Sequence, residues 1–466
     1  MACEKLHSEL PGKVTLPSDE NYDNRANAYH FLSARQRPQC IVSPSSAEDV
    51  SVALKVLRGF PDISFAIKSG GHSPHPDVAN TNNGVVINLE GLDSIARSSD
   101  REDVYELGAG VTWGKVYEVL SKEKRSASGS RECTVGVGGF VTGGGLTYFS
   151  PERGFACDDV VNMQVVLASG DIVETNKTTN ADLFRALKGS RSNVGIVTRV
   201  DIITHARDNI WGGAIMYPAT TEDAQLEAFW DFKSSGIYDP HAQVEVSFIY
   251  SAAMGCSFVS NNHWYGQHIE NPPTFKRFQD IKDQMTNTMR LETIDVFAKE
   301  LSKYGPKDQH AVYVTTTFTL TPTIMKKINS LWNATSATLS TTQNILSVIT
   351  YQQCPPPPPA DAPNAMGFPA TSKPHESLII FIASLYWDLA ADSDFVRQTS
   401  RDLMDKIEEA TKAEGAFHLF KYMNYAAPWQ NVLESYGNEA HDALKDVSAK
   451  YDPEGLFQRQ ALGFKL

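Results

Sequence analysis

A chain of 466 residues is too long for one hydrophobic core of ordinary size, so we expect two domains. Its net charge of −13 disfavours nucleic acid as a partner, because binding to phosphates requires a basic surface. No apolar run reaches the roughly 18 residues that a membrane-spanning helix needs, so we expect no membrane span. These properties favour a protein that acts on a small molecule.

The first two hundred residues alternate between patterns typical of strands and of helices. Ser45 to Glu48 has the form of a helix-capping box, and an apolar stripe of helical spacing follows it. A second helix is predicted from Thr112 to Lys124. Runs of apolar and β-branched residues predict strands at Phe65 to Lys68, Val85 to Leu89, Val104 to Leu107, Val160 to Leu167, Ile172 to Glu174 and Val194 to Ile203.

In the second half of the chain, strand patterns are separated by longer helical segments. The clearest strands are Val244 to Tyr250, Val312 to Leu320 and Ser377 to Leu385. This order predicts a second α+β domain with a mostly antiparallel sheet. Near the end of the sequence, apolar residues from Leu433 to Tyr451 recur at helical spacing and predict a further helix.

The segment IKSGGHSPHP, Ile67 to Pro76, follows the end of a predicted strand. Its adjacent glycines let the backbone approach a flat or charged ligand closely, and Ser69 and Ser73 supply hydroxyl donors. On local sequence alone, a tight turn with a surface histidine is the favoured interpretation, and a ligand-binding loop is the alternative.

The segment TVGVGGFVTGGGLTYFS, Thr134 to Ser150, is dense in glycine, and we expect it to be a loop. Such a loop leaves room for backbone N–H groups to face a diphosphate. It does not match the dinucleotide fingerprint GxGxxG, because Val141 occupies the third glycine position, and no Lys-Ser or Lys-Thr pair ends it as in a P-loop. These differences disfavour NAD and ATP, and they leave another diphosphate ligand or a purely structural loop.

Several segments, taken together and in order, resemble one family. They are SGGHS, VGVGG with GGG just after it, RGFACDDVVNMQVVLASGDIV, ALKGSRSNVGIVTRV, YMNYAAP and the ending KYDPEGLF…GFKL. The family is that of the FAD-linked oxidases of the berberine bridge enzyme type, in the vanillyl-alcohol oxidase/p-cresol methylhydroxylase (PCMH) superfamily. The resemblance extends from about Arg37 to the last residue, and it is strongest to fungal members, many of which act in secondary metabolism.

The fold that this resemblance implies is α+β, with two intertwined domains. A PCMH-type FAD-binding domain would span residues 1–208 and be completed by a berberine-bridge-like segment at 417–466. Residues 209–416 would form the substrate domain, in which helices cover a mostly antiparallel sheet. We expect the flavin ring at the junction, where small-molecule pockets often lie.

The resemblance assigns the 8α bond to the flavin ring to His72, the histidine of SGGHS, whereas His75 lies outside the matching motif. Some relatives form a second bond through a cysteine, but that position is Glu132 here, and Cys133 lies one residue later. A single covalent link to FAD is therefore expected, which would hold the flavin in place and raise its reduction potential. The other cofactor contacts that the resemblance implies are Lys68, Ser69, Gly70, Gly71, Ser73, Val135, Gly136, Gly138, Gly139, Gly143, Gly144, Asp158, Ile196, Val197, Asn424 and Tyr425.

For catalysis, the resemblance points to Tyr422, and a role as a core aromatic is the equally weighted alternative. Relatives often pair this tyrosine with one directly after GGG, where this chain has Leu146, with Tyr148 two residues further on. A phenol with a pKa near ~10 must be shifted, or act in concert with hydride loss, to serve as a base at neutral pH.

The expected reaction is the oxidation of a small organic molecule by hydride transfer to flavin N5. An alcohol, a phenol or a polyketide- or alkaloid-like intermediate would be the substrate, and dioxygen would reoxidise the flavin to give hydrogen peroxide. The alternatives are a dehydrogenase or a cyclase on the same scaffold, and a non-catalytic flavin-binding relative. The expected partners are therefore the small-molecule substrate and dioxygen.

None of the six cysteines forms a CxxC pair, so no metal site is expected. By the resemblance, Cys3 and Cys40 stand where secreted relatives have a disulfide. This favours a protein of the secretory pathway, or a secreted one, whose signal peptide is absent or removed, over a cytoplasmic protein.

Overall fold

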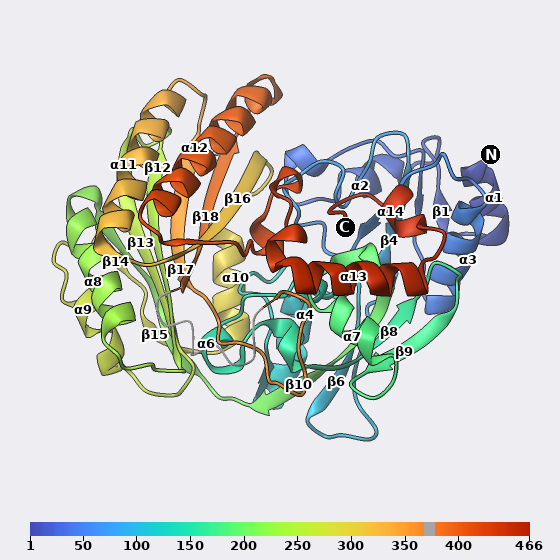
Figure 1. Ribbon diagram of the computed structural model, residues 1–466, viewed down its shortest axis with the longest axis horizontal. Coiled ribbons are helices and arrows are strands. Elements are labelled where there is room, and N and C mark those ends of the chain that lie inside the picture. The colour runs from blue at the N-terminus through green and yellow to red at the C-terminus, as the bar shows by residue number, and fades with distance from the viewer. Residues whose placement is uncertain (368–377) are drawn as a thin grey trace.

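Short runs of apolar and β-branched residues build three β-sheets, which the computed structural model distributes over two lobes (Figure 1). The structure describes residues 1–367 and 378–466. The first lobe holds a four-stranded and a six-stranded sheet, and the second lobe is built on a nine-stranded sheet. The N-terminus lies at the outer edge of the first lobe, and the chain returns to the same lobe at its end (Figure 1).

The four-stranded sheet has the order β1-β2-β4-β3, in which β2 and β3 flank β4 in parallel. Its strands are β1 (Val14–Thr15), β2 (Cys40–Val42), β3 (Phe65–Lys68) and β4 (Val85–Asn88). The six-stranded sheet is antiparallel throughout and is centred on β10. Its strands are β5 (Ile95–Arg97), β6 (Val104–Gly108), β7 (Arg125–Ala127), β8 (Val160–Val166), β9 (Ile172–Asn176) and β10 (Ile196–Ala206).

The helices of the first lobe come from both ends of the chain. They are α1 (Ala2–Glu9), α2 (Tyr22–Ala26), α3 (Ala47–Arg58), α4 (Trp113–Lys122), α5 (Val137–Thr142), α6 (Ser150–Arg153), α7 (Ala181–Leu187), α13 (Asn438–Tyr451) and α14 (Leu456–Arg459). Helix α3 begins where the capping pattern predicts, because the Ser46 side chain accepts the backbone N–H of Asp49. Its apolar stripe is buried against the four-stranded sheet.

All strand pairs of the nine-stranded sheet are antiparallel. The strands are β11 (Ile210–Pro218), β12 (Ala242–Ser251), β13 (Cys256–Tyr265), β14 (Thr286–Asn287), β15 (Arg290–Glu292), β16 (His310–Thr319), β17 (Leu346–Gln353), β18 (Leu378–Trp387) and β19 (Phe417–His418). The helices of this lobe are α8 (Glu222–Ser234), α9 (Lys276–Gln279), α10 (Ile294–Tyr304), α11 (Pro322–Leu339) and α12 (Ser393–Ala413).

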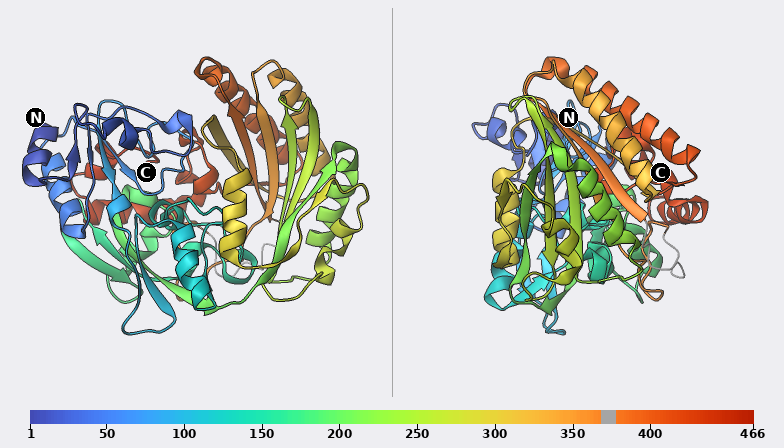
Figure 2. Two further views of the ribbon diagram at one scale, coloured as in Figure 1. Left: turned by 180° about the vertical axis from the view of Figure 1, so that it is seen from behind. Right: turned by 90° about the vertical axis from the view of Figure 1, so that its left-hand side faces the viewer.

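Helices α8, α11 and α12 cover one face of the nine-stranded sheet, and the other face is turned toward the first lobe (Figure 2). All ten residues of β18 are buried, which fits a strand that is covered on both faces. Leu385 packs on the helix side, whereas Tyr386 meets Phe31 of the first lobe. The sheet therefore supplies one wall of the junction between the lobes.

The chain passes from one sheet to the other between Ala206 and Ile210, beside the domain boundary expected at residue 208. The return takes place just after β19, which is still part of the nine-stranded sheet. The last residues then join the four-stranded sheet: the Leu462 N–H donates to the Phe65 carbonyl at 2.8 Å, and Ala461 bridges to Phe65. Residues from the end of the sequence thus become part of the first lobe.

Besides shifts of a few residues at strand ends, three elements differ from the sequence-based expectation. Helix α4 ends at Lys122 rather than Lys124, because Lys124 has a φ of 52°, which no helix accommodates. The glycine-rich segment expected to be a loop contains α5. The last long helix, α13, begins only at Asn438, since Gly437 with a φ of 88° separates it from the preceding turn. Ser377, the first residue of one predicted strand, lies outside the described residues.

A disulfide joins Cys3 to Cys40, as the family resemblance implies, with the two Cα atoms 5.9 Å apart. It ties α1 to β2 and so fixes the N-terminal helix to the four-stranded sheet.

Candidate active site

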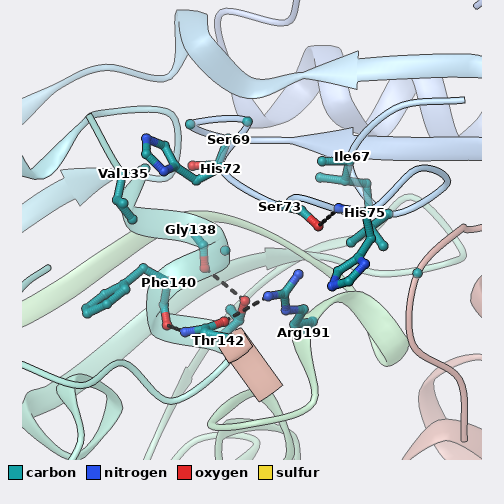
Figure 3. A pocket seen from close by; sticks show the side chains of 18 of the residues that line it. Ile67, Ser69, His72, Ser73, His75, Val135, Gly138, Phe140, Thr142 and Arg191 are labelled. Atoms are coloured by element: carbon teal, nitrogen blue, oxygen red, sulfur yellow. Dashed lines mark hydrogen bonds between the residues drawn. The ribbon is translucent and has the colours of Figure 1, made fainter. Parts of the chain in front are cut away.

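A cavity of about 350 Å³ lies where the two lobes meet. Its walls come from the SGGHS loop after β3, the glycine-rich segment around α5, the start of β10, β16 of the nine-stranded sheet, and two C-terminal segments. Figure 3 shows side chains of the SGGHS loop and of the glycine-rich segment around this space, together with Arg191. Concave sites at the junction of two domains are a usual place for a small-molecule ligand.

Two glycine-rich turns form the floor of the cavity because they approach each other too closely for side chains. A Cβ on Gly70 would lie 2.2 Å from the backbone nitrogen of Gly136. The backbone N–H groups of Val137 and Gly138 donate to the carbonyls of Val111 and Ala109. These two groups are therefore not free to face a diphosphate, and the glycines serve close packing here.

His72 lies at one end of the cavity, beside Val135 (Figure 3). Its Nε2 lies 2.6 Å from Thr134 Oγ1 and 3.2 Å from Glu132 Oε2. Its ring packs on His30, with 4.1 Å between the ring centroids. Burial, and secondarily His30, lower the pKa of His72 well below its ordinary value, so the imidazole is neutral at physiological pH.

His75 lies on the opposite side of the loop, near Arg191 and away from His72 (Figure 3). It is 3% exposed, its ring meets Trp429 edge to face, and burial lowers its pKa to about 3. Its Nε2 has no hydrogen-bond partner among the residues that the structure describes. The two histidines of the motif therefore occupy different parts of the cavity wall.

Arg191 brings an uncompensated cation to the cavity. Its Nη2 donates to Asn424 Oδ1 at 2.8 Å, but its buried Nε has no partner, and no carboxylate pairs with it within residues 1–367 and 378–466. Burial lowers its pKa to about 10. The residue is held at a φ of 53°, an unusual backbone conformation for arginine. A buried guanidinium of this kind calls for an anionic group in the cavity.

Tyr422 lines the same cavity and is almost fully buried. Its hydroxyl accepts the backbone N–H of Leu146 at 2.8 Å and the side-chain amide of Asn424 at 3.2 Å. Its ring stacks on Phe155. Burial, and secondarily Tyr425, raise the pKa of Tyr422 above its ordinary value, although the two hydrogen bonds oppose this shift. The phenol is therefore protonated at neutral pH.

A polar cluster connects the cavity to the nine-stranded sheet. Arg131 pairs with Glu245 of β12 and donates to Gln352 of β17 at 3.0 Å and to the Tyr425 hydroxyl at 2.7 Å. Burial alone would lower the pKa of Arg131, but Glu245 raises it above its ordinary value. Unlike Arg191, this guanidinium is fully compensated. Tyr313 of β16 lies on the cavity wall and shares a hydrogen bond with Tyr386 at 3.0 Å.

The structure brings most of the expected site residues together around the cavity. Those that line it are His72, Ser69, Gly70, Gly71, Ser73, Val135, Gly136, Gly138, Gly139, Ile196, Val197, Tyr422, Asn424 and Tyr425. Their roles toward FAD remain those that the resemblance implies.

Five expected residues lie behind the wall. The Lys68 amine is turned toward Asn88 and Glu90, because β3 directs alternate side chains to opposite faces. Asp158 instead accepts the Phe155 N–H and the Asn364 amide, and burial raises its pKa to about 6. The remaining three are Gly143, which abuts Asn424, Gly144, which abuts Met366, and Tyr148, which donates to the Arg131 carbonyl at 2.9 Å.

No motif or spacing in the sequence singles out Arg131, Arg191 or Tyr313. Arg191 lies inside a matching segment, ALKGSRSNVGIVTRV, but only the fold shows that its side chain enters the cavity. Cys133, by contrast, contacts Ser302, with 2.9 Å between Sγ and Oγ, and does not line the cavity. Among the described residues, no group of three or more His, Cys, Asp and Glu side chains could hold a metal ion.

The cavity suits FAD on observations of this chain alone. The unpaired Arg191 offers a cation to an anionic group such as a diphosphate, and Gly139 leaves open space where any other residue would place a Cβ. Nδ1 of His72 makes no hydrogen bond within the described parts of the chain, so this nitrogen is free to react. No helix in those parts has the length and apolar character needed to cross a membrane.

Comparisons with known proteins agree with this assignment. A family model described as an FAD binding domain matches residues 38–176. The FAD-dependent monooxygenase tpcD of Cochliobolus heterostrophus is 32% identical over 437 residues, which cover 90% of this chain and 83% of that protein. The FAD-dependent monooxygenase sdcF of Emericella nidulans is 30% identical over 475 residues, which cover 100% of this chain and 98% of that protein.

Solved structures share the fold. The 6-hydroxy-D-nicotine oxidase of Arthrobacter nicotinovorans matches with a TM-score of 0.81 at 19% identity and covers 97% of both chains. The glucooligosaccharide oxidase of Acremonium strictum, which carries a 6-S-cysteinyl, 8α-N1-histidyl FAD, matches with a TM-score of 0.75 at 17% identity and covers 99% of this chain and 98% of its own. This chain therefore belongs to the berberine bridge enzyme-like, PCMH-type family of FAD-linked oxidoreductases, and it is an FAD-dependent enzyme.

Proposed function

We propose that this enzyme holds FAD through a single covalent bond to His72 and oxidises a small organic molecule, with dioxygen as the final electron acceptor. The observation that carries the proposal is one cavity that joins a neutral histidine with a free Nδ1, an uncompensated Arg191 and a buried Tyr422 phenol. The histidyl FAD of the glucooligosaccharide oxidase supports the covalent link by analogy.

FAD in this cavity would supply a two-electron acceptor for hydride at N5 and, by reaction with dioxygen, would yield hydrogen peroxide. His72 would hold one end of the ring system, and Arg191 would pair with an anionic part of the cofactor. Asn424 links Arg191 to Tyr422 by accepting from the first and donating to the second. Through these two hydrogen bonds, Asn424 holds the Tyr422 hydroxyl and the Arg191 guanidinium at fixed positions in the cavity wall.

Tyr422 is the group that we propose handles the substrate proton. Its two acceptor positions are filled by Leu146 and Asn424, and its own O–H is not given to any described residue. The phenol can therefore donate to a substrate oxygen, and the same two donors would stabilise it if it gave up its proton as hydride leaves. Because its pKa is raised, a role in concert with hydride loss fits better than one as a standing base.

The walls favour a substrate with a planar aromatic part. Four aromatic residues line the cavity: Phe31, Phe140, Tyr313 and Tyr425. Arg131 is already paired with Glu245, so its cluster offers neutral hydrogen-bond partners rather than a cation for a substrate carboxylate. A phenol, a benzylic alcohol or a polyketide- or alkaloid-like intermediate meets these requirements.

The first test concerns the cofactor. Flavin should remain with the wild-type protein after acid precipitation, and His72→Ala should release it. His75→Ala is the matched control, since it removes a second histidine from the same cavity and should leave the flavin attached. Free release of flavin from the wild-type protein would exclude the covalent link.

The second test concerns the reaction. A metabolite comparison between producing strains with and without the gene identifies the substrate, and peroxide formed under air then separates an oxidase from a dehydrogenase or a cyclase. Substrate that fails to bleach the bound flavin would point to a non-catalytic binder.

The names of two relatives favour a second candidate, because both are called FAD-dependent monooxygenases. In that reaction one oxygen atom of dioxygen enters the product. Turnover under ¹⁸O₂ distinguishes the two: label in the product indicates a monooxygenase, and unlabelled product with stoichiometric peroxide indicates an oxidase.

We also propose that the protein passes through a secretory compartment, on the support of the Cys3–Cys40 disulfide. Both thiols found free in protein from its natural source would favour a cytoplasmic enzyme instead.

A further inference from the structure

The carboxylate of Glu132 meets His72 inside the cavity. Its Oε2 lies 3.2 Å from His72 Nε2, and both residues line the cavity wall. We propose that Glu132 is the positioning residue for covalent flavin attachment: it holds the proton of His72 on Nε2 and so directs the lone pair of Nδ1 toward the cofactor. This inference rests on the proposed His72–FAD bond.

The hydrogen bonds around Glu132 determine which nitrogen of His72 carries the proton. Glu132 accepts the backbone N–H of Thr134 at 3.0 Å and the Thr134 hydroxyl at 2.9 Å. A carboxylate only accepts, and the Thr134 hydroxyl has used its single proton toward Glu132. Nε2 of His72 faces both of these acceptors, so it must be the donor, and the neutral ring has its lone pair on Nδ1.

Glu132 is itself held in place from the second lobe. Ser302 of α10 donates to Glu132 Oε1 and accepts the backbone N–H of Cys133 at 3.0 Å. Helix α10 packs on α4 of the first lobe, so the carboxylate is anchored to both lobes. The Glu132 side chain is 24% exposed, which leaves it accessible from solvent.

The negative charge of Glu132 would assist the step in which His72 bonds to the flavin. Nδ1 bonds to the 8α carbon of FAD while that carbon loses a proton, and two electrons pass into the flavin ring, which becomes reduced. Dioxygen then reoxidises the ring and is itself reduced to hydrogen peroxide. Alkylation at Nδ1 leaves Nε2–H on a cationic imidazolium, and the adjacent carboxylate stabilises this cation or takes its proton.

The test follows covalent attachment rather than turnover. Full-length wild-type, Glu132→Gln, Glu132→Asp and Glu132→Ala proteins are purified with bound FAD and kept in air with excess FAD. The covalent fraction is read over time from flavin fluorescence in denaturing gels. Glu270→Gln is the matched control, because Glu270 is an exposed carboxylate far along the chain and outside the cavity.

We expect Glu132→Gln to slow attachment by about 10- to 100-fold, the range seen when a carboxylate that orients a histidine is removed from a metal site. Glu132→Asp should retain most of the wild-type rate, and Glu270→Gln all of it. Formate should accelerate attachment in Glu132→Ala, because it can enter the vacated, solvent-accessible position. Such rescue would not follow from a merely structural role.

Two results would overturn the inference in distinguishable ways. If Glu132→Gln attaches its flavin at the wild-type rate, the carboxylate has no role in attachment, and the His72 bond stands. Flavin that dissociates from the denatured wild-type protein would remove both the bond and the inference. If Glu132→Gln does not fold, the other two variants decide. The inference is wrong if Glu132→Asp attaches flavin as slowly as Glu132→Ala does and formate does not accelerate attachment in Glu132→Ala.

Discussion

Replacing Tyr422 with phenylalanine separates catalysis from packing. The substitution removes one oxygen and keeps the ring that stacks on Phe155. The buried N–H of Leu146, which donates to this oxygen at 2.8 Å, then loses its acceptor. An unsatisfied buried donor costs about 1–3 kcal/mol, so the free energy of unfolding should fall by an amount in this range.

The expected effect on rate is larger than the effect on stability. A residue that transfers a proton in the transition state contributes about 10²- to 10⁴-fold, which corresponds to about 3–5 kcal/mol. Stopped-flow measurement of flavin reduction, with the substrate identified by the metabolite comparison, should therefore show a 10²- to 10⁴-fold loss, while the affinity for substrate and the flavin spectrum stay close to wild type.

Tyr436→Phe provides the matched control. The Tyr436 hydroxyl is also buried and donates to the Gly189 carbonyl at 2.8 Å, but it does not line the cavity. Its removal should cost a similar amount of stability and leave flavin reduction unchanged. If Tyr422→Phe and Tyr436→Phe both reduce their flavin at the wild-type rate, Tyr422 is a packing residue and the mechanism needs another proton acceptor.

Three further predictions follow from the structure. Cys133→Ser should leave flavin attachment unchanged, because the thiol contacts Ser302 outside the cavity, and a tryptic flavopeptide that contains Cys133 would contradict this. Replacing both Cys3 and Cys40 with serine should lower the free energy of unfolding by about 4 kcal/mol, because the disulfide joins residues 37 positions apart and restricts the unfolded chain. Urea unfolding measures this change, and an unchanged midpoint would refute the prediction. Asp158 has a folded pKa of about 6, above its ordinary 3.8, so its contribution to stability is present below pH 4 and is lost as the pH rises through 6. The free energy of unfolding of Asp158→Asn, relative to that of the wild type, should therefore increase between pH 4 and about 6 and stay constant above this range. If the free energies of both proteins instead change in parallel with pH, Asp158 is not buried in its charged form.

Local patterns predicted the elements of the first lobe well because each element has its own periodicity and cap. β3 begins and ends at Phe65 and Lys68 as predicted, and α3 starts at its serine cap. The helix inside the glycine-rich segment was not predicted, since glycine disfavours an isolated helix. Helix α5 forms because Val137 and Val141 are buried in the core between the sheets, so that tertiary packing outweighs local propensity.

The site was predictable only where it is local in sequence. His72 and the glycine turns belong to short contiguous motifs, and they do line the cavity. The orientation of a side chain within such a motif was not predictable, and Lys68 points away because of the pleat of β3. The side of the cavity that faces the nine-stranded sheet was not predictable from local patterns. Tyr313 reaches the cavity, and Glu245 reaches Arg131, only when residues far apart in the chain form one sheet.

The return of the last residues to the first lobe has a consequence for the synthesis of this enzyme. Phe457 and residues 461–465 line the cavity, and Ala461 completes the edge of β3 beside the SGGHS loop. These residues are translated after every other part of the cavity wall. The first lobe can finish folding only after these residues have emerged from the ribosome, so the cofactor should be captured only then. A nascent chain stalled before residue 457 would hold no flavin, although it already contains the SGGHS loop and the glycine-rich segment.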